Sequence, residues 1–306
     1  MDFNFSQDEL SMYSAPFIVA FILIEVVIGV YKKQHLYDTR ETITNFYLTG
    51  LAIAFNLIFR SFYIWIYGFF YAVKLFEITD PWIYWIGLLI IQDLLFYFLH
   101  LVDHYSRFFW AVHVTHHSST DYNFTVGFRS SVFQPLYRFI YYIPLAWIGF
   151  RPLDIMFMYS AVQVWGIFIH TKTIKKLPAF IEFIFVTPSH HRVHHGSNPL
   201  YLDKNMGMFL IIWDRIFGTF QEEIKKEPVS YGLTTNPQNR GPVNIVLHEF
   251  KSILYDLKKS DGIKNKVKYM FYPPGWSPDG STKTSNQLRI EKYGTANPRL
   301  RNKMAE

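Results

Sequence analysis

The chain alternates between long apolar stretches and polar segments. Residues 14–31 are apolar apart from Glu25, and their number suits the roughly 17–25 residues of a bilayer-spanning helix. Further apolar stretches cover 45–76, which we interpret as one long span, and 81–104. Residues 132–169 are also apolar, with an Arg-Pro pair in the middle, and predict a hairpin of two spans. This pattern predicts an all-α integral membrane helical bundle of about four to five spans.

The segments between and after these stretches are polar. Residues 105–131 predict a connection that contains helical pieces. Residues 206–220 are apolar but too short and too charged for a span, so we expect an interfacial helix there. From residue 221 onward the chain is polar and basic, and we expect a tail that is partly loose at its very end.

Composition supports a membrane protein and excludes several classes of site. Aromatic residues make up 19% of the chain and charged residues only 18%, below the roughly 25% of soluble proteins. There is no cysteine, which excludes disulfides, thiolate-bound iron–sulfur clusters and thiolate zinc sites. The net charge of +6 suits a membrane surface, and no nucleic-acid-binding motif occurs. The acidic first ten residues lack the basic start of a signal peptide.

Histidines gather in three boxes around the predicted membrane boundary. The boxes are HLVDH, HVTHH and HRVHH, and they contain His100 and His104; His113, His116 and His117; and His191, His194 and His195. On a helix, residues three and four apart share a face, so each box is expected to aim its imidazoles at one point. His170 follows an apolar stretch and is expected to join them.

Nine clustered imidazoles exceed the four ligands of one zinc ion and predict two metal ions with four or five ligands each. An all-nitrogen ligand set suits zinc, copper, iron or nickel. A zinc hydrolase usually places a glutamate beside its histidine pair, as in HExxH, and no box contains one. Asp93 shares a helical stripe with His100 and His104, so it is a candidate to orient a histidine from outside the metal shell.

The other three histidines are expected to lie outside the metal site. His35 and His248 stand alone in the sequence. His190 adjoins the third box, but its side chain should point away from the face that the other three share.

The three boxes match, in order, the HxxxH, HxxHH and HxxHH pattern of the fatty acid hydroxylase/sterol desaturase superfamily, which the sequence resembles. These proteins are integral-membrane di-iron oxygenases. The runs at 116–131, 169–172, 187–196 and 203–220 are most similar to the alkylglycerol monooxygenase branch, which cleaves ether lipids. The resemblance divides the chain into membrane spans at 1–80, a fatty acid hydroxylase-like catalytic core at 81–222 and a cytoplasmic tail at 223–306.

The resemblance implies two iron ions, held by the eight box histidines and His170 on the cytoplasmic side of the membrane. It also implies a monooxygenase that hydroxylates a lipid C–H bond with O₂, using tetrahydrobiopterin or another external electron donor. Lysines and an arginine after the first span favour the same cytoplasmic side. The alternatives are a lipid or sterol desaturase of the same superfamily and a non-enzymatic membrane metal-binding protein.

Overall fold

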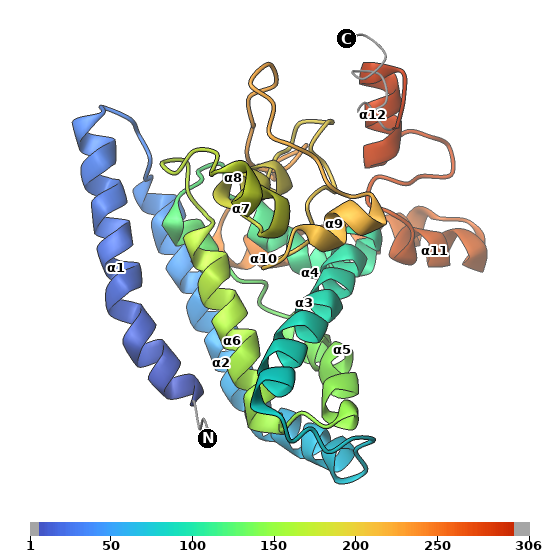
Figure 1. The fold of residues 1–306 in the computed structure, drawn as a ribbon. Helices are drawn as coiled ribbons and strands as arrows, with labels where there is room; N and C mark the ends of the chain where they lie inside the picture. The colour runs from blue at the N-terminus through green and yellow to red at the C-terminus, as the bar shows by residue number, and fades with distance from the viewer. Residues whose placement is uncertain (1–5, 297–306) are drawn as a thin grey trace.

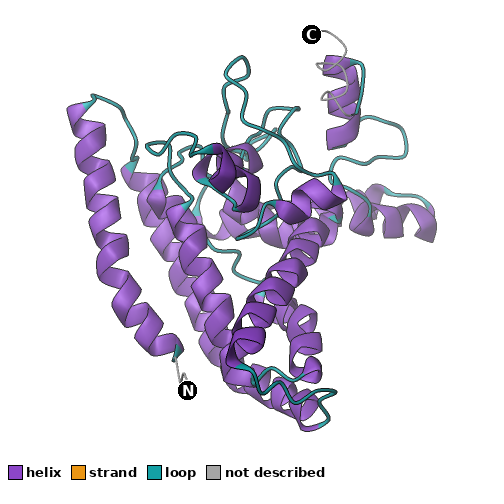
Figure 2. Ribbon diagram, viewed as in Figure 1, coloured by secondary structure: helices purple, strands orange, loops and turns teal. Residues whose placement is uncertain are grey.

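The computed structural model describes residues 6–296 of the 306-residue chain. Within this range the protein is helical and contains no β-strand (Figures 1 and 2). The helices are α1 (Gln7–Tyr31), α2 (Thr39–Ala72), α3 (Pro81–Tyr105), α4 (Arg107–His117), the 3₁₀ turn η1 (Phe124–Phe128), α5 (Pro135–Ile148), α6 (Pro152–Phe168), α7 (Ala179–Ile184), α8 (Pro188–His194), α9 (Ile212–Phe217), α10 (Pro242–Lys259), α11 (Gly262–Phe271) and α12 (Ser285–Tyr293).

Three helices, α1, α2 and α3, are long and apolar enough to cross a membrane. At about 1.5 Å per residue, the 25 residues of α1 extend about 38 Å, against a hydrocarbon core of about 30 Å. The stretch interpreted as one span is indeed a single helix, the 34-residue α2. The sequence thus correctly predicted a helical membrane protein and the first three spans.

The predicted hairpin is present as α5 and α6, but its helices are shorter than the other three. They contain 14 and 17 residues, or about 21 and 26 Å of helix. The turn between them lies against the α2–α3 connection, where the Leu75 amide donates to the Trp147 carbonyl at 2.8 Å. The hairpin therefore runs from the histidine-bearing end of the bundle to the opposite end (Figure 1).

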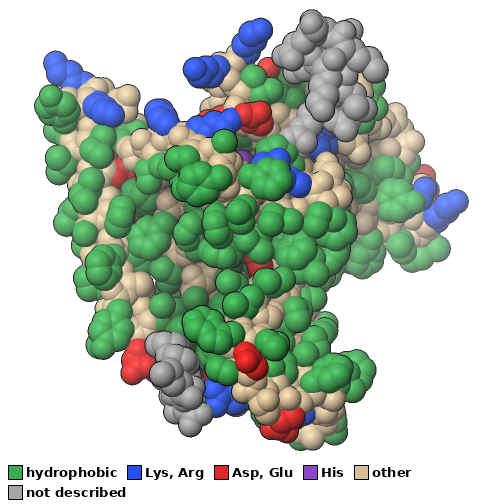
Figure 3. All heavy atoms as spheres, in the orientation of Figure 1, with side chains coloured by type: hydrophobic (Ala, Val, Ile, Leu, Met, Phe, Trp, Pro, Cys, Tyr) green, Lys and Arg blue, Asp and Glu red, His purple; other side chains and the backbone are tan. Residues whose placement is uncertain are grey.

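Apolar side chains cover the visible flank of the bundle, and charged side chains gather toward its two ends (Figure 3). Many outward-facing residues of α1 and α2 are exposed aliphatic or aromatic residues, such as Val27, Ile58 and Trp65. Such a surface is unfavourable in water and suits a lipid environment. The arrangement supports an integral membrane protein.

Two charged residues within the spans have specific partners. Glu25 is 1% exposed, and its carboxylate accepts bonds from the Tyr37 hydroxyl at 2.6 Å, the Phe124 amide at 2.9 Å and the Thr171 hydroxyl. It therefore ties α1 to the polar cap over the bundle. Arg60 of α2 forms an ion pair with Asp8 in the first turn of α1, at 3.9 Å.

The polar segments fold into a cap at one end of the bundle (Figure 2). A single extended residue, Ser106, separates α3 from α4, so the chain changes direction between the first two histidine boxes. The predicted interfacial helix at 206–220 is wrong for most of its length, because only Ile212–Phe217 is helical. The preceding residues are irregular because the Asp93 and Asp214 carboxylates bind their backbone amides.

The C-terminal tail is more ordered than its composition indicated. Helix α10 packs on α4, and the Arg107 guanidinium bonds to Glu249 at 2.7 Å and Asp256 at 2.6 Å. Residues 297–306, where a loose end was expected, lie outside the described residues.

We predict that Glu25→Ala destabilises the protein more than Val27→Ala, which shortens an exposed side chain on the same helix. Removing the carboxylate leaves a buried amide and two hydroxyls without an acceptor, at a cost of about 1–3 kcal/mol for each unsatisfied group. The thermal midpoint of each variant in detergent is the measurement. Equal midpoints for the two variants would show that Glu25 does not hold α1 on the cap.

Candidate metal centre

The structure brings all nine predicted histidines together at the junction of bundle and cap. They form two groups, within each of which one ring nitrogen per residue lies within 4.8 Å of the others. The first group contains His100, His104, His113, His117 and His194, and the second contains His116, His170, His191 and His195. All are buried except His116, which is half-buried. Helices α3, α4 and α8 supply the first group, and α4, α8 and the end of α6 supply the second.

The expectation that each box aims at one point is wrong for the two HxxHH boxes. On α4, His113 and His117 are four residues apart and share the first group, whereas His116 belongs to the second. Adjacent helical residues such as His116 and His117 are about 100° apart around the axis, so they face different sites. The box on α8 is also divided. His194 belongs to the first group, whereas His191 and His195 belong to the second.

Hydrogen bonds outside the groups fix the orientation of five rings. Each donates its Nδ1 hydrogen to an oxygen: His100 to Met206 O at 2.8 Å, His104 to Asp203 Oδ1 at 3.2 Å, His116 to Arg129 O at 2.8 Å, His170 to Gly166 O at 2.6 Å and His194 to Lys204 O at 3.0 Å. A hydrogen on Nδ1 leaves the lone pair on Nε2. These five rings therefore present an unprotonated nitrogen to the interior of their group.

The distances between the interior nitrogens suit ligands of one metal ion better than hydrogen bonds between the rings. His170 Nε2 lies 3.1 Å from His195 Nε2 and 2.9 Å from His191 Nε2. Two nitrogens that bind one ion at about 2.1 Å and at right angles are about 3 Å apart. His104 Nε2 and His194 Nε2 are buried without a hydrogen-bond partner. Buried polar atoms normally have a partner, and a cation in the first group, to which both rings belong, would satisfy them.

Burial also keeps these imidazoles in the form that binds metals. Desolvation lowers the pKa of His116 to about 4. It lowers the pKa of His117, His191 and His195 well below the usual range, and neighbouring histidines add to the effect because a second positive charge nearby is unfavourable. The rings are therefore neutral at pH 7 and have lone pairs available for a metal ion.

The hypothesis that Asp93 orients a histidine is wrong. Its carboxylate accepts hydrogen bonds from the Phe209 amide at 3.0 Å, the Leu210 amide at 2.9 Å and the Trp213 indole at 2.9 Å. These donors belong to the irregular segment whose Met206 carbonyl receives the His100 ring. Asp93 thus supports the loop rather than the histidine itself.

Asp203 has the position that was predicted for Asp93. Burial alone would raise the pKa of Asp203, but the hydrogen bond from the His104 ring holds it below its ordinary value. The residue adopts a left-handed conformation with φ of 51°, which aspartate tolerates better than most residues. No periodic pattern marks Asp203 in the sequence, because it lies in an irregular loop.

A buried arginine supports the second group. Arg129 lies in the loop after η1, and its guanidinium bonds to Glu41 at 3.1 Å and Asn45 at 2.8 Å on α2. These bonds fix the loop whose carbonyl receives His116. Gly127, nearby, packs so closely that a Cβ atom there would lie 2.8 Å from the backbone of Ile167 and 3.2 Å from the His170 ring.

The three remaining histidines lie outside both groups, as predicted. His35 is exposed. His248 lies on α10 and bonds to the Ile245 carbonyl at 3.2 Å. His190 lies beside the second group on α8, but its ring faces Glu182 at 3.1 Å and Thr187.

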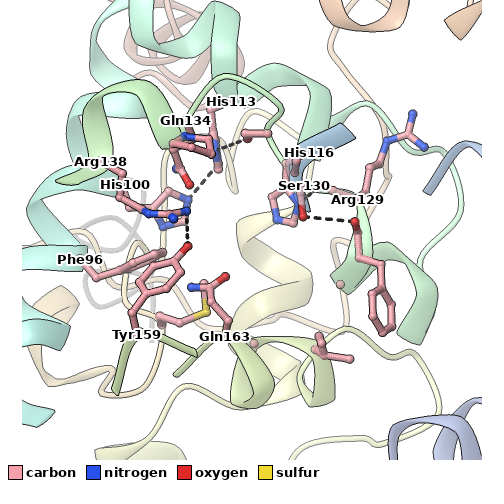
Figure 4. A pocket seen from close by; sticks show the side chains of 18 of the residues that line it. Phe96, His100, His113, His116, Arg129, Ser130, Gln134, Arg138, Tyr159 and Gln163 are labelled. Atoms are coloured by element: carbon pink, nitrogen blue, oxygen red, sulfur yellow. Dashed lines mark hydrogen bonds between the residues drawn. The ribbon is translucent and has the colours of Figure 1, made fainter. Parts of the chain in front are cut away.

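Cavities reach the histidines from both sides. One of about 220 Å³ lies on the bundle side, and its lining includes His100, His113, His116 and His170 together with Phe96, Arg138, Tyr159 and Gln163 (Figure 4). Another, of about 750 Å³, lies between the cap and the tail, and its lining includes His104, His117, His194 and His195. The two groups of ring nitrogens thus separate a bundle-side cavity from a tail-side cavity.

Comparison with known proteins shows that the histidine-bearing segment resembles a known family. Residues 85–219 match the family model described as fatty acid hydroxylase. The segment includes all nine histidines, the two aspartates that fix the 206–214 loop and Asp203. No solved structure was found to match the chain.

The chain is also similar to curated proteins named alkylglycerol monooxygenase. It is 35% identical to the protein of Homo sapiens over 270 residues, which cover 87% of this chain and 59% of the human protein. It is 36% identical to the protein of Caenorhabditis elegans over 209 residues, 65% of this chain and 41% of that protein. The human lathosterol oxidase is 26% identical over 153 residues, 48% of either chain.

The chain spans about three-fifths of the length of the human monooxygenase. The alignment at 35% identity covers 87% of the chain, and the family-model match covers residues 85–219. Residues 85–219, which carry all nine histidines, therefore resemble the fatty acid hydroxylase family.

Proposed function

We propose that the protein is a membrane-bound di-iron monooxygenase that hydroxylates a lipid C–H bond with O₂. The observation that carries the proposal is the convergence of nine histidine rings into two buried, all-nitrogen groups beside a cavity between membrane helices. The nine metal ligands are His100, His104, His113, His117 and His194 for one ion, and His116, His170, His191 and His195 for the other.

The ligand chemistry and the likeness to curated proteins favour iron. Imidazole ligands suit several transition metals, and the match to a fatty acid hydroxylase model favours a redox-active metal, for which we propose iron. Two bound irons would supply O₂ activation. The reaction converts R–H, O₂, two electrons and two protons into R–OH and water.

The residues around the histidines suit an apolar substrate. The bundle-side cavity is lined by Phe96, Ile167 and Met208 as well as by histidines. Apolar walls keep bulk water from the reacting carbon.

The tail-side cavity suits the electron donor. Its lining includes the rings of Trp110 and Trp276 together with Arg107 and Lys283. An aromatic, hydrogen-bonding reductant such as tetrahydrobiopterin has the chemistry to bind there. We further propose that this end of the bundle faces the cytoplasm, because Lys32, Lys33 and Arg40 follow α1 at the histidine-bearing end.

The first test is oxygenase activity with iron content measured on the same sample. Protein purified under anaerobic conditions from iron-supplemented cells should contain about two irons per chain. With tetrahydrobiopterin and O₂ it should oxidise 1-O-alkylglycerol or, in a parallel reaction, lathosterol. Oxidation of the sterol alone would assign a different substrate. Two irons with no O₂ consumption on either lipid would contradict the proposed oxygenase activity.

The division of the histidines predicts the effect of single substitutions. His117→Ala should reduce the affinity of the first site for iron, and His195→Ala that of the second, because each loses one of five or four ligands. Each variant should retain about one iron per chain after dialysis and lose activity. His190→Ala removes a neighbouring ring outside both groups and should retain two irons. Loss of iron from His190→Ala but not from the other variants would refute the assignment.

Two aspartate variants test whether the Asp203 carboxylate strengthens metal binding at the first site. Asp203→Asn replaces the carboxylate that orients His104, so the iron affinity of this site should fall by about 10–100-fold. Asp93→Asn alters the loop at 209–213 and should affect thermal stability more than iron affinity. Competition with a chelator measures the affinity. An Asp203→Asn variant that retains iron as the wild type does would show that the carboxylate is dispensable.

A further inference from the structure

A second cavity continues the bundle-side cavity away from the histidines. It has a volume of about 400 Å³, and tyrosine, phenylalanine, isoleucine and methionine side chains from α2, α5 and α6 form much of its wall. The two cavities share three lining residues, Asn56, Arg138 and Tyr159. These three residues form the wall between the space beside the histidines and the space deeper in the bundle.

The wall is held together by hydrogen bonds centred on Arg138. Its guanidinium donates to the Tyr159 hydroxyl at 2.6 Å and to the Asn56 side-chain oxygen at 2.8 Å. It also lies over the Tyr159 ring, 4.0 Å from the centroid. In the side-chain view, Arg138 and Tyr159 lie on the same side of the cavity as His100 (Figure 4).

Arg138 forms no ion pair in direct contact with a carboxylate among the described residues, and Asp103 is near enough only for a longer-range attraction. The ion pairs of residues 6–296 do not include it. A guanidinium has five N–H groups, and only two of those of Arg138 have protein acceptors. Taking an unpaired cation out of water is unfavourable unless a ligand or another group compensates it. Arg138 therefore has both the charge and the free donors for an acceptor that the protein does not provide.

A second unsatisfied donor lies in the same cavity. The Gln163 side-chain nitrogen is buried without a hydrogen-bond partner, and Gln163 lines the cavity beside the histidines. Its amide lies near Tyr159 in the close view (Figure 4). Because Tyr159 accepts a bond from Arg138, its own hydroxyl hydrogen is free to donate. Arg138, Tyr159 and Gln163 thus offer hydrogen-bond donors from α5 and α6.

We infer that Arg138, Tyr159 and Gln163 bind an acceptor oxygen of the lipid substrate and so fix which carbon lies beside the histidines. This inference rests on the proposed oxygenase function. The oxygen lies at the wall between the cavities, the reacting carbon lies in the 220 Å³ cavity and the hydrocarbon chain extends into the 400 Å³ cavity. Arg138 is a positioning residue for the substrate, and the oxygen belongs to an ether, a hydroxyl or a carboxylate.

Equilibrium binding to the iron-loaded full chain, without reductant, tests this inference independently of turnover. The probes are 1-O-hexadecylglycerol, hexadecanoic acid and the diol in which a methylene replaces the ether oxygen. Arg138→Met should weaken binding of at least one oxygen-bearing probe by about tenfold or more, because a charged hydrogen bond is lost. An effect on the ether lipid but not on its methylene analogue identifies the ether oxygen. An effect on the acid alone identifies a carboxylate, and an equal effect on both diols alone identifies their hydroxyls.

Further variants keep the test decisive if Arg138→Met does not fold. Arg138→Lys retains the charge but loses the planar fork, and Gln163→Leu removes the unsatisfied amide. Both should weaken binding of the same probe and raise its KM while iron content stays at the wild-type value. Arg40→Met, at an exposed arginine near the start of α2, should bind every probe as the wild type does.

Wild-type affinity of the Arg138 and Gln163 variants for all three probes would overturn the inference. Hexadecane, which has no oxygen, serves as a further control ligand. If the variants weaken the binding of hexadecane as much as that of the three probes, the inference is also overturned, because that result reflects lost packing alone. A wild-type protein that binds a probe through Arg138 but oxidises no lipid would contradict the proposed function and leave the binding site standing.

Discussion

The orientation of the histidine rings is the constraint on which the rest of the structure depends. The nine imidazoles can share two sites only if their metal-binding nitrogens point inward. Backbone carbonyls and one carboxylate accept the Nδ1 hydrogens of five rings and so direct Nε2 to the interior. Those acceptors belong to different segments of the chain, so the bundle, the loop at 203–211 and the loop after η1 must all be in place to form the centre.

The buried carboxylates within the bundle also help to orient the histidine rings. Glu25 fastens α1 to η1 and to the loop after His170. Asp93 and Asp214 bind successive backbone amides of the irregular segment that presents the Met206 carbonyl. Buried carboxylates are costly unless hydrogen bonds satisfy them, and here each one is satisfied by donors that fix a loop. The buried charges therefore hold the loops that orient the rings.

The sequence predicted the elements with strong periodic signals and missed those that depend on tertiary contacts. Apolar length identified α1, α2 and α3. The spacing of the boxes identified eight of the nine clustered histidines, and the place of His170 after an apolar stretch identified the ninth. Helical geometry alone could not divide a box between two sites, because that division depends on how α4 and α8 face each other. Asp203 and the carbonyl acceptors lie in loops, where no pattern marks them. Asp93 was misassigned because its stripe on α3 also faces the 206–213 loop.

Iron X-ray absorption spectroscopy of the loaded protein tests the central claim most directly. Two sites built from the five-histidine and four-histidine groups predict a first shell dominated by imidazole nitrogens, about four to five per iron at about 2.1 Å, with the outer-shell scattering of imidazole rings. A first shell dominated by oxygen, with one or two imidazoles per iron, would contradict the claim that these nine rings form the metal centre.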